Sequence, residues 1–345
     1  MSFLLLLELT LGCALASAAA TGLALLWLRR QRVLDHPNER SSHDQPTPRG
    51  GGLAVVPVLA VAWLGLALFG LVPERLETTG IVVGAILLAG VSWQDDRTGL
   101  SALLRLGAQL LVVAAGLFLL PGLGNVFQGL FPPWLDIVVT GLLWVWFVNL
   151  YNFMDGIDGI TGAQTIVLGI GVAAATFCAG DQQSGGLFLG LSLAAVAMGF
   201  LPWNWQPAKL FLGDVGSVPL GFVTGWLLLG LAGRGHWAPA AILPLYYLAD
   251  ATLTLLHRAL RLRPIWRAHR EHIYQQAVQL GRSHAAVVIR VLAANLALIL
   301  LAVIASVWPV TGPFALVGGL AVVALLMMHL LRRADSAPLD EADPT

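Results

Sequence analysis

The sequence has little charge: only 11% of its 345 residues are Asp, Glu, Lys or Arg, whereas a soluble domain has about a quarter. It also lacks a long polar segment, and 57% of its residues are hydrophobic. These proportions exclude an ordinary soluble domain and are typical of a membrane protein. The formal net charge is zero, so the composition indicates no nucleic-acid partner.

Several familiar motifs are also missing. The two cysteines, Cys13 and Cys178, lie in apolar runs without metal-ligand spacing, so we expect reduced, buried thiols and no disulfide framework. No Cys/His set has zinc spacing, and there is no Walker A lysine motif or internal repeat. No basic residue precedes the first apolar run, whereas Arg29 and Arg30 follow it, and the run is too long for a signal-peptide core. We therefore expect a retained first helix.

Long apolar runs dominate what is present. A membrane-spanning helix needs about 20 apolar residues, or somewhat fewer when neighbouring helices shelter it. On this basis we expect eleven spans: 3–28, 51–72, 78–94, 103–120, 134–150, 160–180, 185–203, 215–233, 238–257, 286–308 and 311–331. The sequence thus predicts an all-α, polytopic membrane helix bundle. Residues 1–333 are expected to form one integral membrane catalytic domain, and 334–345 a disordered cytoplasmic tail.

The basic residues test this count. When the eleven spans alternate sides, all but two of the 19 Lys and Arg residues fall on one side, and only Arg75 and Arg234 fall on the other. Basic residues gather on the cytoplasmic side of membrane proteins. The predicted topology therefore has the N-terminus outside and the C-terminus in the cytoplasm.

Acidic residues gather at the same cytoplasmic helix ends. Three separate segments carry them, namely VSWQDDRTG with Asp95 and Asp96, NFMDGIDG with Asp155 and Asp158, and LFLGDVGS with Asp214. Helix packing could bring such ends together into one cleft. We therefore expect a single site that combines five carboxylates.

The first two segments each have a simpler interpretation. Asp95 and Asp96 could be solvated charges at a helix end, but adjacent helical residues point about 100° apart, so a functional pair would be asymmetric. One carboxylate would then face the site while the other orients a partner or a metal-bound water. Asn152, Asp155 and Asp158 could form a polar turn, yet a turn alone does not need this spacing of acids and amide.

Asp214 lies between Gly213 and Gly216, which suit a tight turn that exposes backbone N–H groups. Ser217 could cap the following helix, whose N-terminus would favour an anion. Lys209 supplies a cation nearby. Together these residues indicate a phosphate-binding turn.

Three further features remain open in the sequence. PTPRGGG, residues 46–52, is either a linker or a backbone that approaches a phosphate or lipid headgroup closely. The basic segment 263–270, with His269 and His272, is either a loop attracted to anionic lipid or a clamp for pyrophosphate. Asp250 lies inside an apolar run and needs a partner such as Arg258.

This constellation suits Mg²⁺-dependent phosphoryl transfer from a soluble, doubly phosphorylated donor to a membrane-embedded acceptor. Mg²⁺ takes few protein oxygens and several waters or phosphate oxygens, which fits a sparse set of carboxylates and one carboxamide. A transporter or lipid flippase is the alternative, but it would carry charges near mid-membrane and an internal repeat. A non-catalytic scaffold has no use for five carboxylates at one face.

The ordered motifs SSHDQPTPRGG, DDRTGLSALLRLGAQ, NLYNFMDGIDG, LFLGDVGS and HREHIYQQAVQLG closely resemble those of the polyprenyl-phosphate N-acetylhexosamine-1-phosphate transferases. This family also includes phospho-N-acetylmuramoyl-pentapeptide transferase. The resemblance runs from about residue 35 to 290. It implies transfer of a sugar 1-phosphate from a UDP-sugar to undecaprenyl phosphate, with release of UMP, at the start of cell-surface glycan and cell wall biogenesis.

The resemblance also implies roles for individual residues. Asn152 and Asp214 match Mg²⁺ ligands of the family, with Mn²⁺ as an expected substitute. Asp95 or Asp96 matches the proposed base for the lipid phosphate. The other matched positions are His272 as a catalytic imidazole, Asp155 and Asp158 around the metal and uridine, and the basic residues Arg105, Arg267 and Arg270 near the substrates.

One motif departs from the family pattern. Many members have Asp-Arg-x-His-x-His-His, whereas this chain has His269 to Gln275, in which Arg270 and His272 keep the pattern. Its His-x-Tyr-Gln form resembles members that initiate O-antigen, a lipopolysaccharide component, with a 6-deoxy N-acetyl sugar. The resemblance further implies a multi-pass protein of the bacterial inner membrane, in contact with membrane lipid and active at the cytoplasmic face. A homodimer stays open.

Overall fold

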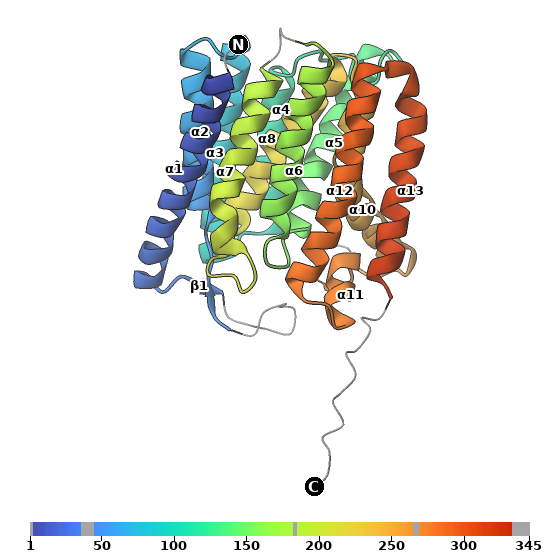
Figure 1. Ribbon diagram of the computed structural model, residues 1–345. Helices are drawn as coiled ribbons and strands as arrows, with labels where there is room; N and C mark the ends of the chain where they lie inside the picture. Colours follow the sequence, from blue (N-terminus) through green and yellow to red (C-terminus); the bar gives the residue numbers. More distant parts are fainter. Residues whose placement is uncertain (1–2, 36–44, 182–184, 265–268, 333–345) are drawn as a thin grey trace.

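Most residues that the structure describes lie in helices (Figure 1). The computed structural model describes residues 3–35, 45–181, 185–264 and 269–332. The helices are α1 (Phe3–Arg30), α2 (Gly52–Leu68), α3 (Arg75–Thr98), α4 (Ala102–Leu117), α5 (Pro133–Phe153), α6 (Ile160–Cys178), α7 (Gly186–Asn204), α8 (Asp214–Gly233), α9 (Trp237–Ile242), α10 (Leu245–Leu260), α11 (Ile273–Gln279), α12 (His284–Val307) and α13 (Gly312–Leu330), the last preceded by the 3-10 turn η1 (Pro309–Thr311). Two short strands, β1 (Leu34–Asp35) and β2 (Thr47–Pro48), pair antiparallel. The predicted all-α polytopic fold is confirmed, and the predicted tail 334–345 lies outside the described residues.

Every predicted span falls on helical structure. In the described ranges, eight helices are long and apolar enough to cross a membrane, namely α1, α3, α5, α6, α7, α8, α12 and, together with η1, α13. Helices α2 and α4 are apolar but shorter. The predicted span 238–257 is broken into α9 and α10 next to Pro244, which has no N–H to continue a helical ladder. The count of eleven and the orientation stay predictions.

Helix α8 lies at the centre of the bundle. In the most apolar window of α8, 94% of the residues are buried, whereas the corresponding share in α1, at the edge of the bundle, is 22%. The Trp144 ring of α5 stacks on Phe222 of α8 at 4.9 Å, and its Nε1 donates a hydrogen bond of 2.9 Å to the Phe222 carbonyl. Helices α2, α3 and α5 pack along α8. This central position puts Asp214, the first residue of α8, where several other helix ends meet.

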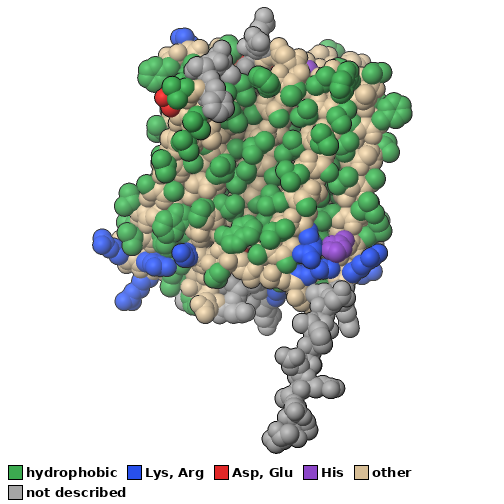
Figure 2. Space-filling model, in the orientation of Figure 1, with side chains coloured by type: hydrophobic (Ala, Val, Ile, Leu, Met, Phe, Trp, Pro, Cys, Tyr) green, Lys and Arg blue, Asp and Glu red, His purple; other side chains and the backbone are tan. Residues whose placement is uncertain are grey.

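The two ends of the bundle differ in charge. We call the end that carries β1 and α11, at the bottom of Figure 1, the lower end, and the other the upper end. Figure 2 shows Lys and Arg side chains gathered along the lower rim, below a surface that is largely hydrophobic. Arg75 begins α3 and Arg234 follows α8, so both lie at the upper end. Among the described residues, Arg75 and Arg234 thus lie at the end opposite the basic lower rim.

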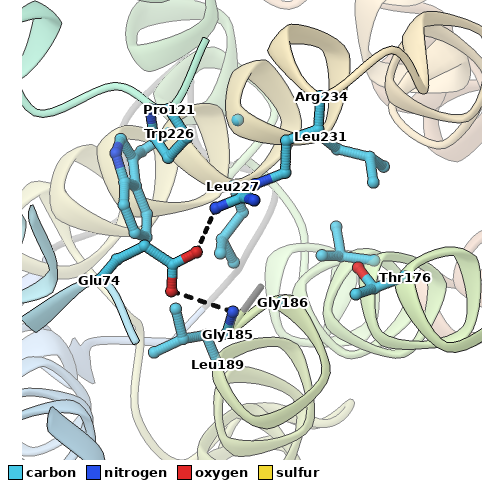
Figure 3. Close-up of a pocket in the computed structure, with 12 residues that line it drawn as sticks. Glu74, Pro121, Thr176, Gly185, Gly186, Leu189, Trp226, Leu227, Leu231 and Arg234 are labelled. Carbon is cyan, nitrogen blue, oxygen red and sulfur yellow. Dashed lines mark hydrogen bonds and ion pairs between the residues drawn. The ribbon is translucent and has the colours of Figure 1, made fainter. Parts of the chain in front are cut away.

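The upper end contains a pocket between α3, α6, α7 and α8 (Figure 3). The Glu74 carboxylate pairs with Arg234 there and accepts a hydrogen bond of 3.0 Å from the Gly185 N–H. Apart from these two charged residues and Thr176, the lining is apolar or glycine. This pocket lies at the opposite end from the predicted carboxylates and is not the predicted site.

The cysteines differ in exposure. Cys13 is buried as expected, but Cys178 is exposed, because it is the last residue of α6 and its side chain extends beyond the packed part of that helix. The expectation of two buried thiols is therefore wrong for Cys178. Labelling experiments with new cysteines need a Cys178→Ala background.

Topology predicts which ends react with an impermeant thiol reagent in intact cells. In that background, we expect Asn125→Cys at the upper end to label from outside, because its side chain is exposed. Thr98→Cys and Gln279→Cys, exposed at the lower end, should label only after the cells are permeabilised. Labelling of Gln279→Cys in intact cells would reverse the predicted orientation.

Candidate active site

Arg49 joins two carboxylates that are far apart in the sequence. Its Nη2 lies 2.9 Å from Asp96 Oδ1, at the end of α3, and 2.6 Å from Asp214 Oδ1, at the start of α8. Burial alone would lower the pKa of Arg49, but the carboxylates of Asp214 and Asp96 outweigh it and raise that pKa, so the guanidinium stays charged. Three segments of the lower end thus meet at one cation.

The backbone around PTPRGGG explains this position of Arg49. Arg49 forms a parallel β-bridge with Phe211, and the N–H groups of Gly50 and Gly51 donate to the Phe211 carbonyl at 3.1 and 2.8 Å. The Gly52 N–H donates to Leu212 at 2.9 Å. The segment is therefore not a linker: it holds the start of α2 against the turn that precedes Asp214.

Gly213 keeps this turn compatible with the charged residues. Its φ is +74°, in the left-handed region that residues with a Cβ rarely adopt. A Cβ on Gly213 would lie 3.2 Å from both Arg49 Cγ and Asp96 Oδ2. Only glycine gives the backbone this turn and leaves room for the Arg49–Asp96 contact.

The adjacent carboxylates Asp95 and Asp96 have different partners. Asp96 Oδ2 accepts a hydrogen bond of 3.3 Å from the Val215 N–H in the first turn of α8. Asp95 turns away, since its Oδ1 accepts from the Leu100 N–H at 2.6 Å and its Oδ2 lies 3.2 Å from Arg105 Nη1. Asp96 therefore faces the site, whereas Asp95 ties the α3–α4 turn and orients Arg105.

Asn152 and Asp155 lie on the other side of Asp214. The Asn152 carboxamide oxygen accepts a hydrogen bond of 2.7 Å from the Ser217 hydroxyl, one turn along α8 from Asp214. Burial raises the pKa of Asp155 to about 6, a hydrogen bond with Thr161 opposes this rise, and the nearby Asp214 carboxylate adds to it. The Asp214 carboxylate is thus close enough to affect the pKa of Asp155.

Asp158 contacts two neighbouring segments of the chain. Its Oδ2 accepts a hydrogen bond of 3.0 Å from the Ala208 N–H, and its Oδ1 lies 3.3 Å from His284 Nδ1 at the start of α12. Asp158 is buried. It therefore fixes the loop 154–159 to two neighbouring segments, and the structure does not bring its carboxylate to Arg49.

Asp250 holds α11 in place. This fully buried carboxylate accepts hydrogen bonds from the first two N–H groups of α11, those of Ile273 at 2.8 Å and Tyr274 at 3.1 Å, and one from the Tyr246 hydroxyl at 3.1 Å. A carboxylate at a helix N-terminus satisfies donors that have no partner within the helix. The partner that Asp250 needs is therefore the backbone of α11. Arg258 instead pairs with Glu271.

His272 is the residue before α11 and is 3% exposed. Its Nδ1 lies 3.5 Å from Asp250 Oδ1, and its ring stacks on Tyr274 at 5.8 Å and contacts His269 at 4.8 Å. Burial and then the neighbouring His272 lower the pKa of His269 to about 4, so His269 is neutral near pH 7. His272 therefore lies in a packed ring cluster with little access to water.

Helix α11 contacts the loop of Asp155 directly. The Tyr274 hydroxyl donates a hydrogen bond of 2.9 Å to the Phe153 carbonyl, and Tyr274 is fully buried. A Cβ on Gly156 would lie 2.2 Å from this hydroxyl and 3.0 Å from Gln275 Nε2. The side chains of Tyr274 and Gln275 therefore pack inward and shape the loop 154–159.

The remaining basic candidates are placed less centrally. The Lys209 ammonium lies 5.9 Å from the centre of the Trp203 ring, so its described contact is with that ring. The Arg270 carbonyl accepts a hydrogen bond from Gln279 Nε2 at 2.8 Å. Arg267 lies outside the described residues. Arg49 contacts Asp96 and Asp214, and Arg105 pairs with Asp95. Arg49 was not among the site residues predicted from the sequence, although it lies in the PTPRGGG segment noted there.

The donor atoms near Arg49 fit a hard cation. Asp96 and Asp214 supply carboxylate oxygens beside Arg49, and the Asn152 carboxamide oxygen lies at Ser217, one turn along α8 from Asp214. These are the ligand types that Mg²⁺ prefers. Two carboxylate oxygens from different helices already converge on one cationic nitrogen. Within the described ranges, no group of three or more His, Cys, Asp or Glu is arranged to hold a metal. The fit is thus to an ion that keeps several waters or phosphate oxygens.

Comparisons with known proteins identify relatives of this chain. The model of glycosyl transferase family 4 matches residues 78–232, which include Asp96, Asn152 and Asp214. A Bacillus subtilis (strain 168) protein named probable undecaprenyl-phosphate N-acetylglucosaminyl 1-phosphate transferase is 32% identical, covering 73% of this chain and 71% of that protein. Decaprenyl-phosphate N-acetylglucosaminephosphotransferase of Mycolicibacterium smegmatis is 28% identical, covering 96% and 90%. Phospho-N-acetylmuramoyl-pentapeptide-transferase of Chlamydia muridarum is 28% identical, covering 58% and 68%.

The role of Asp250 can be tested by hydrogen exchange. Asp250→Asn should speed amide exchange in α11 by about 10-fold or more, because a buried N–H that loses a charged acceptor costs about 1–3 kcal/mol. Exchange in the loop 154–159 should rise with it through Tyr274.

Asp136 supplies the matched control at the upper end. It is also fully buried, and it accepts from the N–H groups of Val126 at 3.3 Å and Phe127 at 2.9 Å. Asp136→Asn should loosen the segment 122–131 and leave α11 unchanged. If Asp250→Asn leaves exchange in α11 at the wild-type rate, Asp250 does not anchor that helix.

Proposed function

The chain belongs to glycosyl transferase family 4, and from this premise we propose that it transfers a sugar 1-phosphate from a UDP-sugar to undecaprenyl phosphate. The observation that carries the proposal is the meeting of Arg49, Asp96 and Asp214 at the lower end. Carboxylates and a guanidinium at the mouth of a membrane bundle suit a reaction between a water-soluble and a lipid-borne phosphate.

The proposed reaction needs positioning and charge stabilisation more than proton transfer. An oxygen of the lipid monophosphate attacks the phosphorus that carries the sugar. The bond from this phosphorus to the bridging oxygen breaks, and UMP leaves with that oxygen. A phosphate monoester has a second pKa of about 6 and is mostly dianionic at neutral pH, so little proton removal is needed. Asp96 is therefore proposed to orient the acceptor site rather than to act mainly as a base.

The residues around Arg49 have different proposed roles in metal binding and in substrate binding. Asp214 and Asn152, with Asp96 beside them, are proposed to hold Mg²⁺, or Mn²⁺ in its place, which would offset charge on the transferred phosphoryl group. Arg49 is proposed to keep Asp96 and Asp214 at a fixed separation while it neutralises their mutual repulsion. Asp155, beside Asp214, is proposed to contact the uridine part of the donor.

The outer residues of the site are proposed to steer and position substrates. Arg105, oriented by Asp95, and the segment with Arg267 and Arg270 are proposed to attract the donor phosphates. His272 is proposed to act as a positioning residue, because it is buried and its ring stacks on Tyr274, which contacts the loop 154–159. Asp158 is proposed to hold the same loop from the other side.

The cellular setting is proposed from topology and from the relatives. The basic lower rim suits the cytoplasmic face of a bacterial inner membrane, where nucleotide sugars are found. The Bacillus and Mycolicibacterium relatives are named for N-acetylglucosamine, which favours this sugar as the first donor to test. A 6-deoxy N-acetyl sugar and a role in O-antigen synthesis remain the second candidate, favoured by the His-x-Tyr-Gln motif.

Release of UMP by the purified protein tests the proposed reaction. With UDP-N-acetylglucosamine, undecaprenyl phosphate and Mg²⁺, we expect UMP formation that requires the lipid. Asp96→Asn and Asp214→Asn should each lower the rate by about 100-fold or more, since they remove charge at the reacting phosphates. Residual activity of Asp214→Asn should need more Mg²⁺.

Glu77→Gln is the matched control, because it makes the same change on α3 at the end opposite Asp96. It should keep the wild-type rate. Full activity of Asp214→Asn with unchanged Mg²⁺ dependence would contradict the site assignment. Absence of UMP formation across a panel of UDP-N-acetyl sugars, the 6-deoxy forms included, would contradict the reaction itself.

A double-mutant cycle tests the different roles of the adjacent carboxylates. If Asp95 acts only by orienting Arg105, then Asp95→Asn, Arg105→Gln and the double variant should lose activity to the same extent, roughly 10-fold. Asp96→Asn should lose more than any of the three. Additive losses in the double variant would show that Asp95 has a role of its own.

A further inference from the structure

A second group of charged residues lies at the lower end, where α12 begins and α13 ends. Arg290 Nε donates a hydrogen bond of 3.0 Å to His329 Nε2, which joins the two helices. Arg282 Nη2 donates to the carbonyls of His329 at 2.9 Å and Arg332 at 3.1 Å, the last carbonyls of α13 and of the residues after it. Arg290 and Arg282 thus both contact His329, and the backbone of Arg332 lies beside them.

These arginines lack acidic partners in the described part of the chain. No ion pair there joins Arg282, Arg290 or Arg332 to a carboxylate, whereas Arg49, at the same end, pairs with two. The Arg282 Nε is buried without a hydrogen-bond acceptor among the described residues. His329 Nε2 accepts from Arg290, so the imidazole adds no further donor at that nitrogen. Among the described residues, the group is therefore a concentration of positive charge without a carboxylate partner.

The helix surface above the arginines is apolar and exposed. Figure 2 shows basic and histidine side chains gathered at the lower ends of α12 and α13, directly below hydrophobic side chains of the same helices. Ile289, Leu296, Leu325 and Met328 are each at least half exposed on these two helices. In a membrane protein such side chains face acyl chains, and the arginines lie at the depth of the headgroups.

We propose that Arg282, Arg290 and Arg332 bind the headgroup phosphate of an anionic phospholipid, whose acyl chains lie along the exposed side chains of α12 and α13. Charge complementarity favours this occupant, since juxtamembrane arginines attract anionic lipid and guanidinium groups hydrogen bond phosphate oxygens in pairs. The apolar surface next to the cations favours a lipid over free phosphate. By holding α12 and α13 together, the lipid would stabilise α12, whose first residue, His284, contacts Asp158.

Native mass spectrometry of the detergent-solubilised full chain tests this site. Titration with phosphatidylglycerol should show one lipid bound more tightly than the others, and titration with phosphatidylcholine should not. Arg290→Gln combined with Arg332→Gln should weaken the tight phosphatidylglycerol by about 10- to 30-fold, because each arginine near a membrane surface contributes about 1 kcal/mol. Arg282 is left in place, since it also caps α13.

Two further variants separate this site from general charge and from misfolding. Arg29→Gln with Arg30→Gln removes the same charge from the lower end of α1 and should keep the tight lipid. Arg290→Lys with Arg332→Lys should restore most of the binding, which shows that the glutamine variant lost charge rather than its fold. The thermal unfolding midpoint in lipid-free detergent should be the same for both glutamine variants.

Three results would overturn the proposal. The first is tight phosphatidylglycerol binding that survives Arg290→Gln with Arg332→Gln. The second is an equal loss in the α1 variant, which would indicate nonspecific attraction to the whole lower rim. The third is displacement of the lipid by millimolar inorganic phosphate, which would indicate a free anion site.

Discussion

The contact of the Arg49 guanidinium with Asp96 and Asp214 is the constraint around which the lower end is built. Two carboxylates that approach each other at a membrane surface repel strongly unless a cation lies between them. That cation is the guanidinium of Arg49, which belongs to a third segment. Its position is fixed because the backbone of this segment is hydrogen bonded to Phe211 and Leu212. The first turn of α2, the last turn of α3 and the first turn of α8 are thereby set in one arrangement.

A second constraint fixes the opposite wall of the site. Asp250 caps α11, and α11 holds the loop 154–159 through the Tyr274 hydroxyl and the Phe153 carbonyl. Asp155 is in this loop, and its pKa is raised by burial first and then by the nearby Asp214 carboxylate. The two constraints are therefore connected: one sets Asp214, and the other sets the loop that faces it.

The sequence predicted much of this because helix ends can be read from hydropathy and charge. The apolar runs predicted where the helices lie, and the alternation of basic residues predicted that Asp96, Asp155 and Asp214 lie at one end of the bundle. Contacts between distant segments could not be predicted in this way. Arg49 and Asp214 are separated by 165 residues, and no local pattern says that a Pro-Arg-Gly run will pair with the turn before α8. The inward packing of Tyr274 likewise depends on tertiary contacts, whereas the break next to Pro244 has a local cause, because proline has no N–H to continue the helix.

The two ends of the bundle use the same interaction for different purposes. Asp136 at the upper end and Asp250 at the lower end are both fully buried carboxylates that accept two backbone N–H groups. At the upper end the held segment lies near Glu74 and Arg234, which pair with each other. At the lower end the held helix borders Asp155, while Arg282, Arg290 and Arg332 have no carboxylate partners among the described residues. Cations without carboxylate partners among the described residues of the lower end suit anions that approach from that side of the membrane, since a guanidinium group binds phosphate in paired hydrogen bonds.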